Sequence, residues 1–161
     1  MQYNIKQMVF DFSYLLILGA TLGGVLVLGI FVAPLIFHTE RLLVAPLDHY
    51  SAGVVMGAIF HRFSYWVYLT VIFVGVYEIV QYRAQRRDRV AILSALAVMG
   101  AALLFSAVYT PKILQMQAEG VAATQSAAFN SLHIASEIDF KILALALLVL
   151  FVRRLMLLRI K

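Results

Sequence analysis

The stretch that decides the fold is "NSLHIASEIDFKILALALLVLFVRRL", residues 130–155, in which an apolar run follows several ionisable side chains. A helix needs about 20 mainly apolar residues to cross a bilayer. This run, extended to about 133–157, is long enough, and so are three others at about 12–37, 59–82 and 90–111. We therefore predict an all-α membrane protein: a bundle of four transmembrane helices that forms a single domain over residues 1–161.

The composition supports this prediction. Hydrophobic residues make up 63% of the chain, charged residues 13%, and the mean hydropathy is +0.93, which lies outside the range of soluble domains. The chain has no cysteine, which excludes disulfides, iron–sulfur clusters and thiolate metal sites.

The net charge of +5 indicates orientation rather than a nucleic-acid partner. Basic residues gather in the second loop and in the C-terminal tail, namely Arg83, Arg86, Arg87, Arg89, Arg153, Arg154, Arg159 and Lys161. Under the positive-inside rule both regions are cytoplasmic, so both termini lie inside. We expect a bacterial inner membrane, with the lipid bilayer as the surrounding partner and no nucleic acid.

Small residues predict close helix packing. Gly19 and Gly23 in the first run, and Gly53 and Gly57 before the second, are spaced four apart, which lets helix backbones approach closely. This spacing serves packing within one bundle or contact between copies in a homo-oligomer, a dimer or trimer. The third run is rich in Ala and Ser, which predicts a closely packed helix.

Prolines predict where the spans kink or end, and polar loops predict where short helices lie between them. Pro34 should kink the first span or help to end it, and Pro111 should end the third. The loops at residues 38–53 and 112–131 are amphipathic, and we expect short helices at the outer interface in both.

The ionisable groups of the last span fall in its outer half on this topology. At about 100° per residue, one stripe of roughly 80° holds Asn130, His133, Glu137 and Lys141. Ser136 lies on its flank and Asp139 points away. The same outer side is predicted to carry His38, His49, His61 and Arg62.

This constellation predicts an outward-facing polar cavity in a non-enzymatic protein that binds or transports a metal ion or small solute. Its lining would be His133, Glu137, Lys141, Asp139, Arg62 and Ser136. His133 and Glu137, at i and i+4, could share a transition-metal ion, with His61 or His38 completing the site.

Two alternatives stay open. A haem-dependent membrane oxidoreductase would use His133 with His61 or His38 as axial ligands. A structural or assembly protein would use Glu137 and Lys141 only as an i, i+4 ion pair.

Elsewhere the sequence favours structural roles. Glu78, near the inner end of the second span, is predicted to pair with Arg83 at the membrane surface, and a role as a proton relay is the less favoured alternative. Tyr65, Trp66 and Tyr68 resemble an aromatic belt that anchors the helix at the interface.

The chain also resembles a known family. "GIFVAPLIF", "AGVVMGAIFHRFSYW", "YTPKI" and "FNSLHIASEID" look like motifs of domain of unknown function 4149, which is similar to human transmembrane protein 205. The matching positions are Gly29, Pro34, Phe37, Gly53, Gly57, Phe60, Tyr109, Pro111, His133 and Ser136. Glu137, Asp139 and Lys141 do not belong to that pattern.

The resemblance implies a four-helix membrane bundle and, through eukaryotic relatives, a link to export of toxic metal compounds. More distantly, the four-span plan is similar to the copper-resistance membrane component CopD and to HemJ-type protoporphyrinogen oxidases. The first-span histidine pattern of the HemJ type is absent here. A shared fold does not transfer chemistry, so the resemblance adds fold information above all.

Overall fold

A computed structural model describes residues 5–41 and 46–159, and within those ranges the chain is helical with no strand. Residues 42–45 of the first loop and Lys161 of the basic tail lie outside the described residues. Four long rods run in chain order: α1 (Ile5–Leu26), the π-helix η1 (Val27–Val32) and α2 (Ala33–Phe37); α3 (His49–Arg83); α4 (Arg89–Leu103), the π-helix η3 (Leu104–Tyr109) and α5 (Thr110–Ala118); and α7 (Ala127–Arg159). Short helical pieces η2 (Thr39–Arg41) and α6 (Val121–Thr124) connect them.

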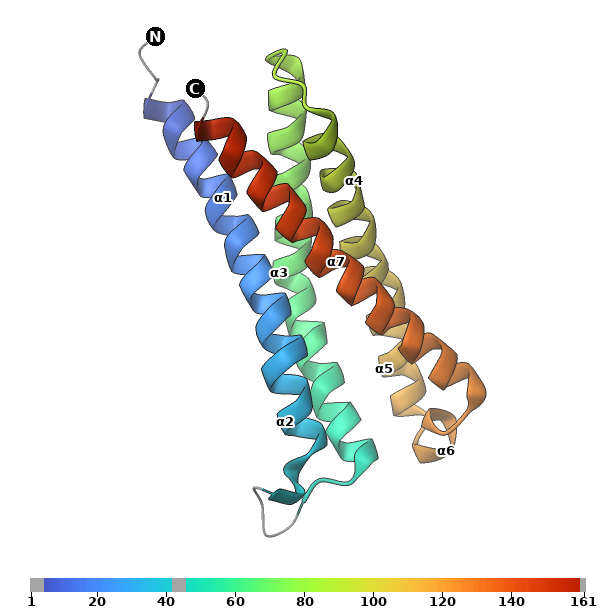
Figure 1. Ribbon diagram of the computed structural model, residues 1–161. Coiled ribbons are helices and arrows are strands. Elements are labelled where there is room, and N and C mark those ends of the chain that lie inside the picture. The colour runs from blue at the N-terminus through green and yellow to red at the C-terminus, as the bar shows by residue number, and fades with distance from the viewer. Residues whose placement is uncertain (1–4, 42–45, 160–161) are drawn as a thin grey trace.

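The rods form a closed ring in which α1 packs against α3 and α7, and α4 against the same two helices (Figure 1). The start of α1, the end of α7 and the loop 84–88 lie together at one end of the bundle. We call this the basic end. The opposite end carries α2, α6 and the starts of α3 and α7, and we call it the histidine end.

Three of the rods are long and apolar enough to cross a membrane: Ile5–Phe37, His49–Arg83 and Arg89–Ala118. α7 has similar length but carries charges toward both ends, so that its longest uncharged part within the quoted stretch is residues 142–152. Each rod is longer than the sequence predicted. α3 begins at His49 rather than near residue 59, because Asp48 caps it by accepting a hydrogen bond from the Ser51 amide (3.0 Å).

Two of the three prolines, Pro34 and Pro111, lie just after a π-helical segment. One residue separates Pro34 from the end of η1 at Val32, and one separates Pro111 from the end of η3 at Tyr109. Proline has no N–H and its ring clashes with the carbonyl four residues earlier, and a π-helical turn relieves that clash by widening the helix. The prediction that Pro111 ends the third span is therefore wrong, because the rod continues to Ala118.

The wider turn at η3 leaves one carbonyl to be satisfied from another helix. The Thr110 amide bonds to the Phe105 carbonyl, and the next amide position is Pro111, which has no hydrogen for the Ser106 carbonyl. The Tyr68 hydroxyl donates to that carbonyl instead (3.0 Å). The Trp66 Nε1–H likewise donates inward, to Thr21 Oγ1 (2.9 Å), so both side chains join helices rather than only marking an interface.

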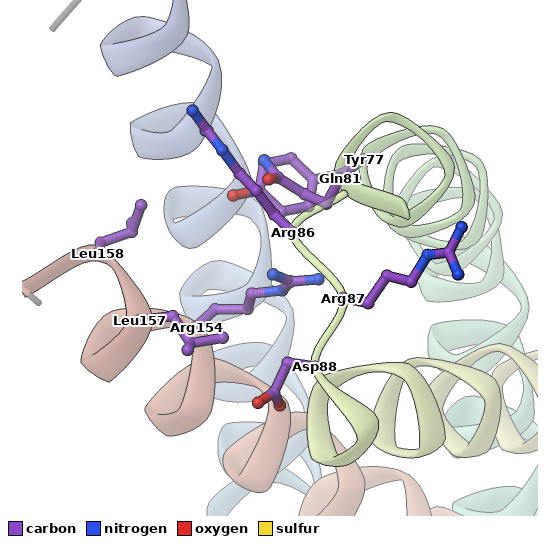
Figure 2. Close-up of a pocket in the computed structure, with 8 residues that line it drawn as sticks. All are labelled: Tyr77, Gln81, Arg86, Arg87, Asp88, Arg154, Leu157 and Leu158. Carbon is purple, nitrogen blue, oxygen red and sulfur yellow. The ribbon is translucent and has the colours of Figure 1, made fainter. Parts of the chain in front are cut away.

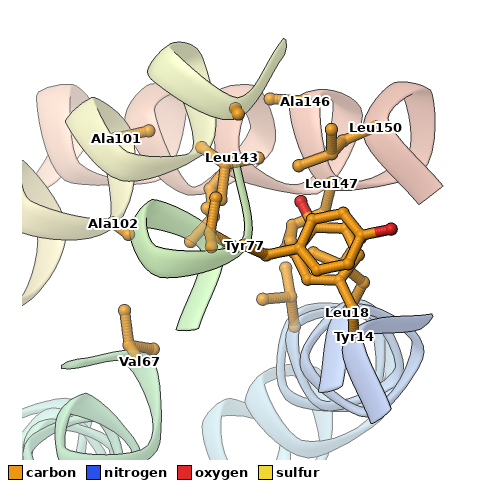
Figure 3. Close-up of a cluster of buried hydrophobic side chains, with 14 of the residues drawn as sticks. Tyr14, Leu18, Val67, Tyr77, Ala101, Ala102, Leu143, Ala146, Leu147 and Leu150 are labelled. Atoms are coloured by element: carbon orange, nitrogen blue, oxygen red, sulfur yellow. The ribbon is translucent and has the colours of Figure 1, made fainter. Parts of the chain in front are cut away.

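The core lies between the four rods (Figure 3). Leu143, Leu147 and Leu150 of α7 pack against the buried alanines of α4, as the Ala-rich third run predicts, and against Leu18 of α1. At one side of this aliphatic layer the rings of Tyr14 and Tyr77 stack, with centroids 3.6 Å apart and planes at 7°. The core is therefore aliphatic between α1, α4 and α7, with the stacked tyrosines towards the basic end.

One glycine of the predicted packing motif is needed for a close helix contact. A Cβ on Gly57 would lie 2.6 Å from Gln117 Oε1 and 3.1 Å from Leu114 Cδ2, both on α5. The Tyr50 hydroxyl donates to the Gln117 carbonyl (2.7 Å). Gly57 therefore lets α5 lie directly against the first turns of α3.

We predict that Gly57→Ala destabilises the protein relative to Gly100→Ala. Both changes gain helix propensity equally, but Gly100 has nothing within 4 Å of an added Cβ. Overpacking should make the Gly57 variant less stable by about 1–3 kcal/mol. Thermal unfolding in mild detergent, followed by circular dichroism, measures the difference, and equal melting temperatures would contradict the close contact.

Candidate functional site

The predicted polar stripe forms on the surface of α7. His133 Nε2 lies 3.2 Å from Glu137 Oε1, and Lys141 Nζ lies 3.7 Å from Glu137 Oε2. The three side chains share one face, as the spacing predicts, and 44–74% of each is exposed. An exposed i, i+4 pair stabilises a helix by about 0.3–0.5 kcal/mol, so this stripe is a weak surface network.

Among the described residues the histidines do not gather with carboxylates into a cluster of the metal-ligand type. Within residues 5–41 and 46–159, no three His, Asp or Glu side chains come together in a group that could hold a metal ion. His61 is exposed and contacts Tyr65, while the His38 ring bonds to the Pro34 carbonyl. The completion of the His133–Glu137 pair by His61 or His38 stays a prediction.

Asp139 lies on the opposite side of α7 from the stripe, as predicted. It is 6% exposed, and among the described residues its Oδ2 has no hydrogen-bond partner. Ser136 is also buried and donates to the His133 carbonyl (2.7 Å). Arg62 is exposed on α3. The predicted lining residues Asp139 and Ser136 are thus buried, whereas Arg62 and the stripe are exposed.

The charged groups that the bundle buries are at the basic end instead. Glu78 of α3 is 8% exposed and Arg154 of α7 is 4% exposed. The guanidinium donates to both carboxylate oxygens, with 2.9 Å between Nε and Oε1 and a second, shorter contact from the terminal nitrogen to Oε2. The predicted surface pair of Glu78 with Arg83 is therefore wrong, because Glu78 turns inward.

Two tyrosines join this pair to α1. The Tyr14 hydroxyl donates to Glu78 Oε1 (2.9 Å), and the Tyr77 hydroxyl donates to Asp11 Oδ1 (2.7 Å). Both α1 and α3 thus supply one carboxylate and one phenol. The two phenol rings are the stacked pair of the core. Gln81 Nε2 also donates to Asp11 (3.3 Å). We call Asp11, Tyr14, Tyr77, Glu78, Gln81 and Arg154 the buried cluster.

A second ion pair lies beside the buried cluster, where α4 begins. Arg153 donates two hydrogen bonds to Asp88, at 3.0 and 2.7 Å. The Asp88 carboxylate also caps α4 by accepting from the Ala91 amide (2.9 Å). Arg153 and Arg154, adjacent in the sequence, therefore tie α7 to α4 and to α3.

The loop between α3 and α4 turns sharply at Gln85, whose φ is +60°. The Gln85 amide bonds to the Tyr82 carbonyl (3.2 Å) and the Arg86 amide to the Gln81 carbonyl (3.0 Å). This is the Schellman arrangement that ends many helices, in which glycine usually takes the left-handed position. The turn sets the course of residues 86–88 over the buried cluster.

A cavity of about 170 Å³ opens at this end, and we call it the basic-end cavity (Figure 2). Its lining comes from α3, the loop and α7, and consists of Tyr77, Gln81, Arg86, Arg87, Asp88, Arg154, Leu157 and Leu158. Figure 2 shows Arg154 reaching between the helices toward the loop. The predicted polar cavity was placed at the histidine end, whereas this one lies at the opposite end and shares no residue with the prediction.

The charges around the basic-end cavity do not cancel. Asp88 is bonded to Arg153 and Glu78 to Arg154. Arg86 lies within 3.5 Å of the Gln7 amide, and the Arg87 guanidinium lies 4.1 Å from the centroid of the Tyr82 ring. Within the described residues, no ion pair joins Arg86 or Arg87 to a carboxylate. The cavity therefore carries two arginines whose charge remains available to an anion.

Sequence reasoning missed the buried cluster although a signal existed. Glu78 and Arg154 each lie five residues before the end of their helix, at Arg83 and Arg159. Because α3 and α7 both end at the same end of the bundle, the charges of Glu78 and Arg154 must lie at a similar distance from that end. Tyr77 and Gln81, spaced by four, share a helix face, as do Asp11 and Tyr14, spaced by three.

The profile of a family described as Domain of unknown function (DUF4149) matches residues 16–122. This range contains eight of the ten positions named for the resemblance, and His133 and Ser136 lie beyond it. It also contains Tyr77, Glu78 and Gln81 of the buried cluster. No curated protein and no solved structure matches the chain.

Removing only one partner of the buried Glu78–Arg154 pair should destabilise the protein far more than removing both. We predict that Glu78→Leu costs about 3–5 kcal/mol, because Arg154 is left buried without a counter-charge. The double variant Glu78→Leu/Arg154→Met should recover most of that loss. Thermal unfolding in detergent measures both. Glu137→Leu is the matched control in the exposed stripe and should change stability by less than about 1 kcal/mol; an equal effect at the two glutamates would contradict the difference in burial.

Asp88 predicts a pH dependence of stability. The hydrogen bonds from Arg153 lower the pKa of its carboxyl from 3.8 to about 2, against the raising effect of partial burial, and the Ala91 amide adds to the lowering. The folded-state pKa is below the unfolded one, so this stabilisation is complete above about pH 4 and is lost as the pH falls toward 2.

The matched variant is Asp88→Asn, which keeps a good helix cap and removes only the charge. It should be less stable than the parent by about 2 kcal/mol at pH 7, and the two should converge near pH 2. Thermal unfolding of both proteins between pH 2 and 7 provides the measurement. A constant difference across this range would refute the assignment.

Proposed function

This chain belongs to the family described as Domain of unknown function (DUF4149), and we propose that it is a four-span protein of a bacterial inner membrane that binds a small anion in the basic-end cavity. The observation that carries this proposal is the cavity itself. It is lined by three arginines, one of them buried against Glu78 and two without a carboxylate partner among the described residues.

The proposal that α7 is the fourth span rests on its surface. Leu145 of α7 is 63% exposed, much as Phe12 of α1 (66%), Ile72 of α3 (64%) and Leu93 of α4 (67%) are. Every rod exposes large apolar side chains, which suits contact with lipid. The charges of α7 do not oppose this, because Arg153 and Arg154 are paired within the bundle and the ionisable groups before Ile142 lie near the histidine end.

The proposed orientation places the basic end in the cytoplasm. The loop 84–88 lies at the same end as the start of α1 and the end of α7 (Figure 1), as an even number of crossings requires. Arg86 and Arg87 lie in this loop, and Arg83 and Arg89 flank it. The positive-inside rule assigns such a loop to the cytoplasm. The basic-end cavity would then open to the cytoplasm. The dimer or trimer stays a prediction.

An anion is the ligand that this cavity suits best. A guanidinium binds carboxylate or phosphate through paired hydrogen bonds, and the cavity has room for an oxyanion with a few waters. Buried ionisable groups in membrane helices commonly mark a binding site or pathway. Arg86 and Arg87 would attract the anion, and Arg154 lies deeper, beside Tyr77.

Glu78 would control access to Arg154, because its carboxylate already occupies the guanidinium fork. An anion would have to compete with this carboxylate, so removal of the Glu78 charge should free the Arg154 guanidinium. The Tyr14 hydroxyl and the Arg154 guanidinium are the groups bonded to Glu78.

We predict that inorganic phosphate or succinate raises the melting temperature of the detergent-solubilised protein, whereas chloride at equal ionic strength does not. A ligand at a hundred times its dissociation constant adds about 2.7 kcal/mol to stability. Arg86→Gln/Arg87→Gln should weaken binding on the order of thirtyfold, taking about 1 kcal/mol for each arginine. Glu78→Gln should bind the anion more tightly, because it removes the counter-charge that occupies the Arg154 guanidinium.

The matched control is Arg83→Gln/Arg89→Gln, which removes the same charge from the ends of the helices that flank the loop without touching the cavity lining. It should bind phosphate as the parent does. Equal loss in both double variants would show a general charge effect and refute the site. Absence of binding by either oxyanion to the parent protein would refute the proposed function itself.

A further inference from the structure

We propose that the anion bound in the basic-end cavity is the headgroup of a phospholipid, whose acyl chain lies in an apolar groove between α1 and α7. This inference rests on the proposed function, since it names the class of ligand for the same cavity. It is carried by a second hollow of the surface that adjoins the first.

The groove has a volume of about 650 Å³ and is lined only by apolar side chains: Leu15, Val152, Leu155, Met156 and Leu158. Leu15 comes from α1 and the other four from the last turns of α7. Val152, Leu155 and Met156 are 38–51% exposed. This surface can therefore accept a hydrocarbon chain without displacing a protein contact.

Leu158 lines both the groove and the basic-end cavity. The two hollows therefore adjoin, and a single molecule could occupy both. Leu157, on the cavity side, extends the apolar edge. The combined site has a charged part and an apolar part, which is the division of a phospholipid into headgroup and chain. A free oxyanion would use only the first part.

The charge of the polar part suits a phosphate. Arg86 and Arg87 contact an amide and an aromatic ring rather than a carboxylate. Basic pockets between helix ends at a membrane surface bind anionic headgroups. The position fits, because the basic end is where the four rods meet one surface of the bilayer.

The test compares four ligands on the full chain, delipidated in mild detergent: phosphatidylglycerol, phosphatidylcholine, glycerol phosphate and inorganic phosphate. Binding is followed by native mass spectrometry and by melting temperature. We expect phosphatidylglycerol to bind at least tenfold more tightly than phosphatidylcholine, whose headgroup is neutral. It should also bind at least tenfold more tightly than glycerol phosphate or inorganic phosphate, which have no acyl chain. Arg86→Gln/Arg87→Gln should lose about thirtyfold in affinity for phosphatidylglycerol.

The groove is tested by Leu155→Trp, which places a larger side chain in it and should weaken phosphatidylglycerol binding tenfold or more. Leu145→Trp is the matched control, because Leu145 is exposed on the same helix but lines neither hollow. It should bind the lipid as the parent does. The affinity of Leu155→Trp for inorganic phosphate should also be unchanged, which checks that the cavity is intact.

The outcomes separate the two proposals. If phosphate and glycerol phosphate bind as tightly as phosphatidylglycerol and Leu155→Trp has no effect, the lipid inference is refuted and the anion site stands. If phosphatidylcholine binds as well as phosphatidylglycerol, the arginines do not select the headgroup and the inference is again refuted. If none of the four ligands binds, both proposals fail.

Discussion

The bond between Glu78 and Arg154 is the interaction on which the rest of this structure depends. Both groups are almost fully buried, and a buried charge is tolerated only when it is paired and hydrogen-bonded. The bidentate contact fixes the rotation of α7 about its axis and its height against α3. Tyr14 then ties the same carboxylate to α1, so three helices meet at one group.

The two ends of the bundle use similar residues with different consequences. At the histidine end, the side chains of His133, Glu137 and Lys141 are 44–74% exposed, so their attraction is weak. At the basic end, Glu78 and Arg154 are withdrawn from water, where each would be costly without the other. Breaking the buried pair by removing one partner should cost several times more free energy than breaking an exposed pair. Because the basic end also has the cavity and two uncompensated arginines, it is the candidate site.

The helical, membrane-like fold could be predicted from the sequence, because hydrophobic runs of bilayer length report directly on the surroundings of a helix. The shared face of His133, Glu137 and Lys141 could be predicted as well, since helix geometry alone sets it. The continuation of the third rod past Pro111 could not, because it requires a π-helical turn and the Tyr68 hydroxyl from α3. The full length of α3 also exceeded its apolar run, since Asp48 caps it upstream.

The sequence by itself determined that the chain is helical, that its rods match a bilayer in length, and where its basic residues gather. Those properties depend on composition and on spacing along one helix. Only the tertiary structure decided that Glu78 pairs with Arg154 rather than Arg83, and that the polar cavity lies beside them. A buried charge selects its partner by depth and direction across helices, and residues distant in the chain acquire those relations only when the rods pack.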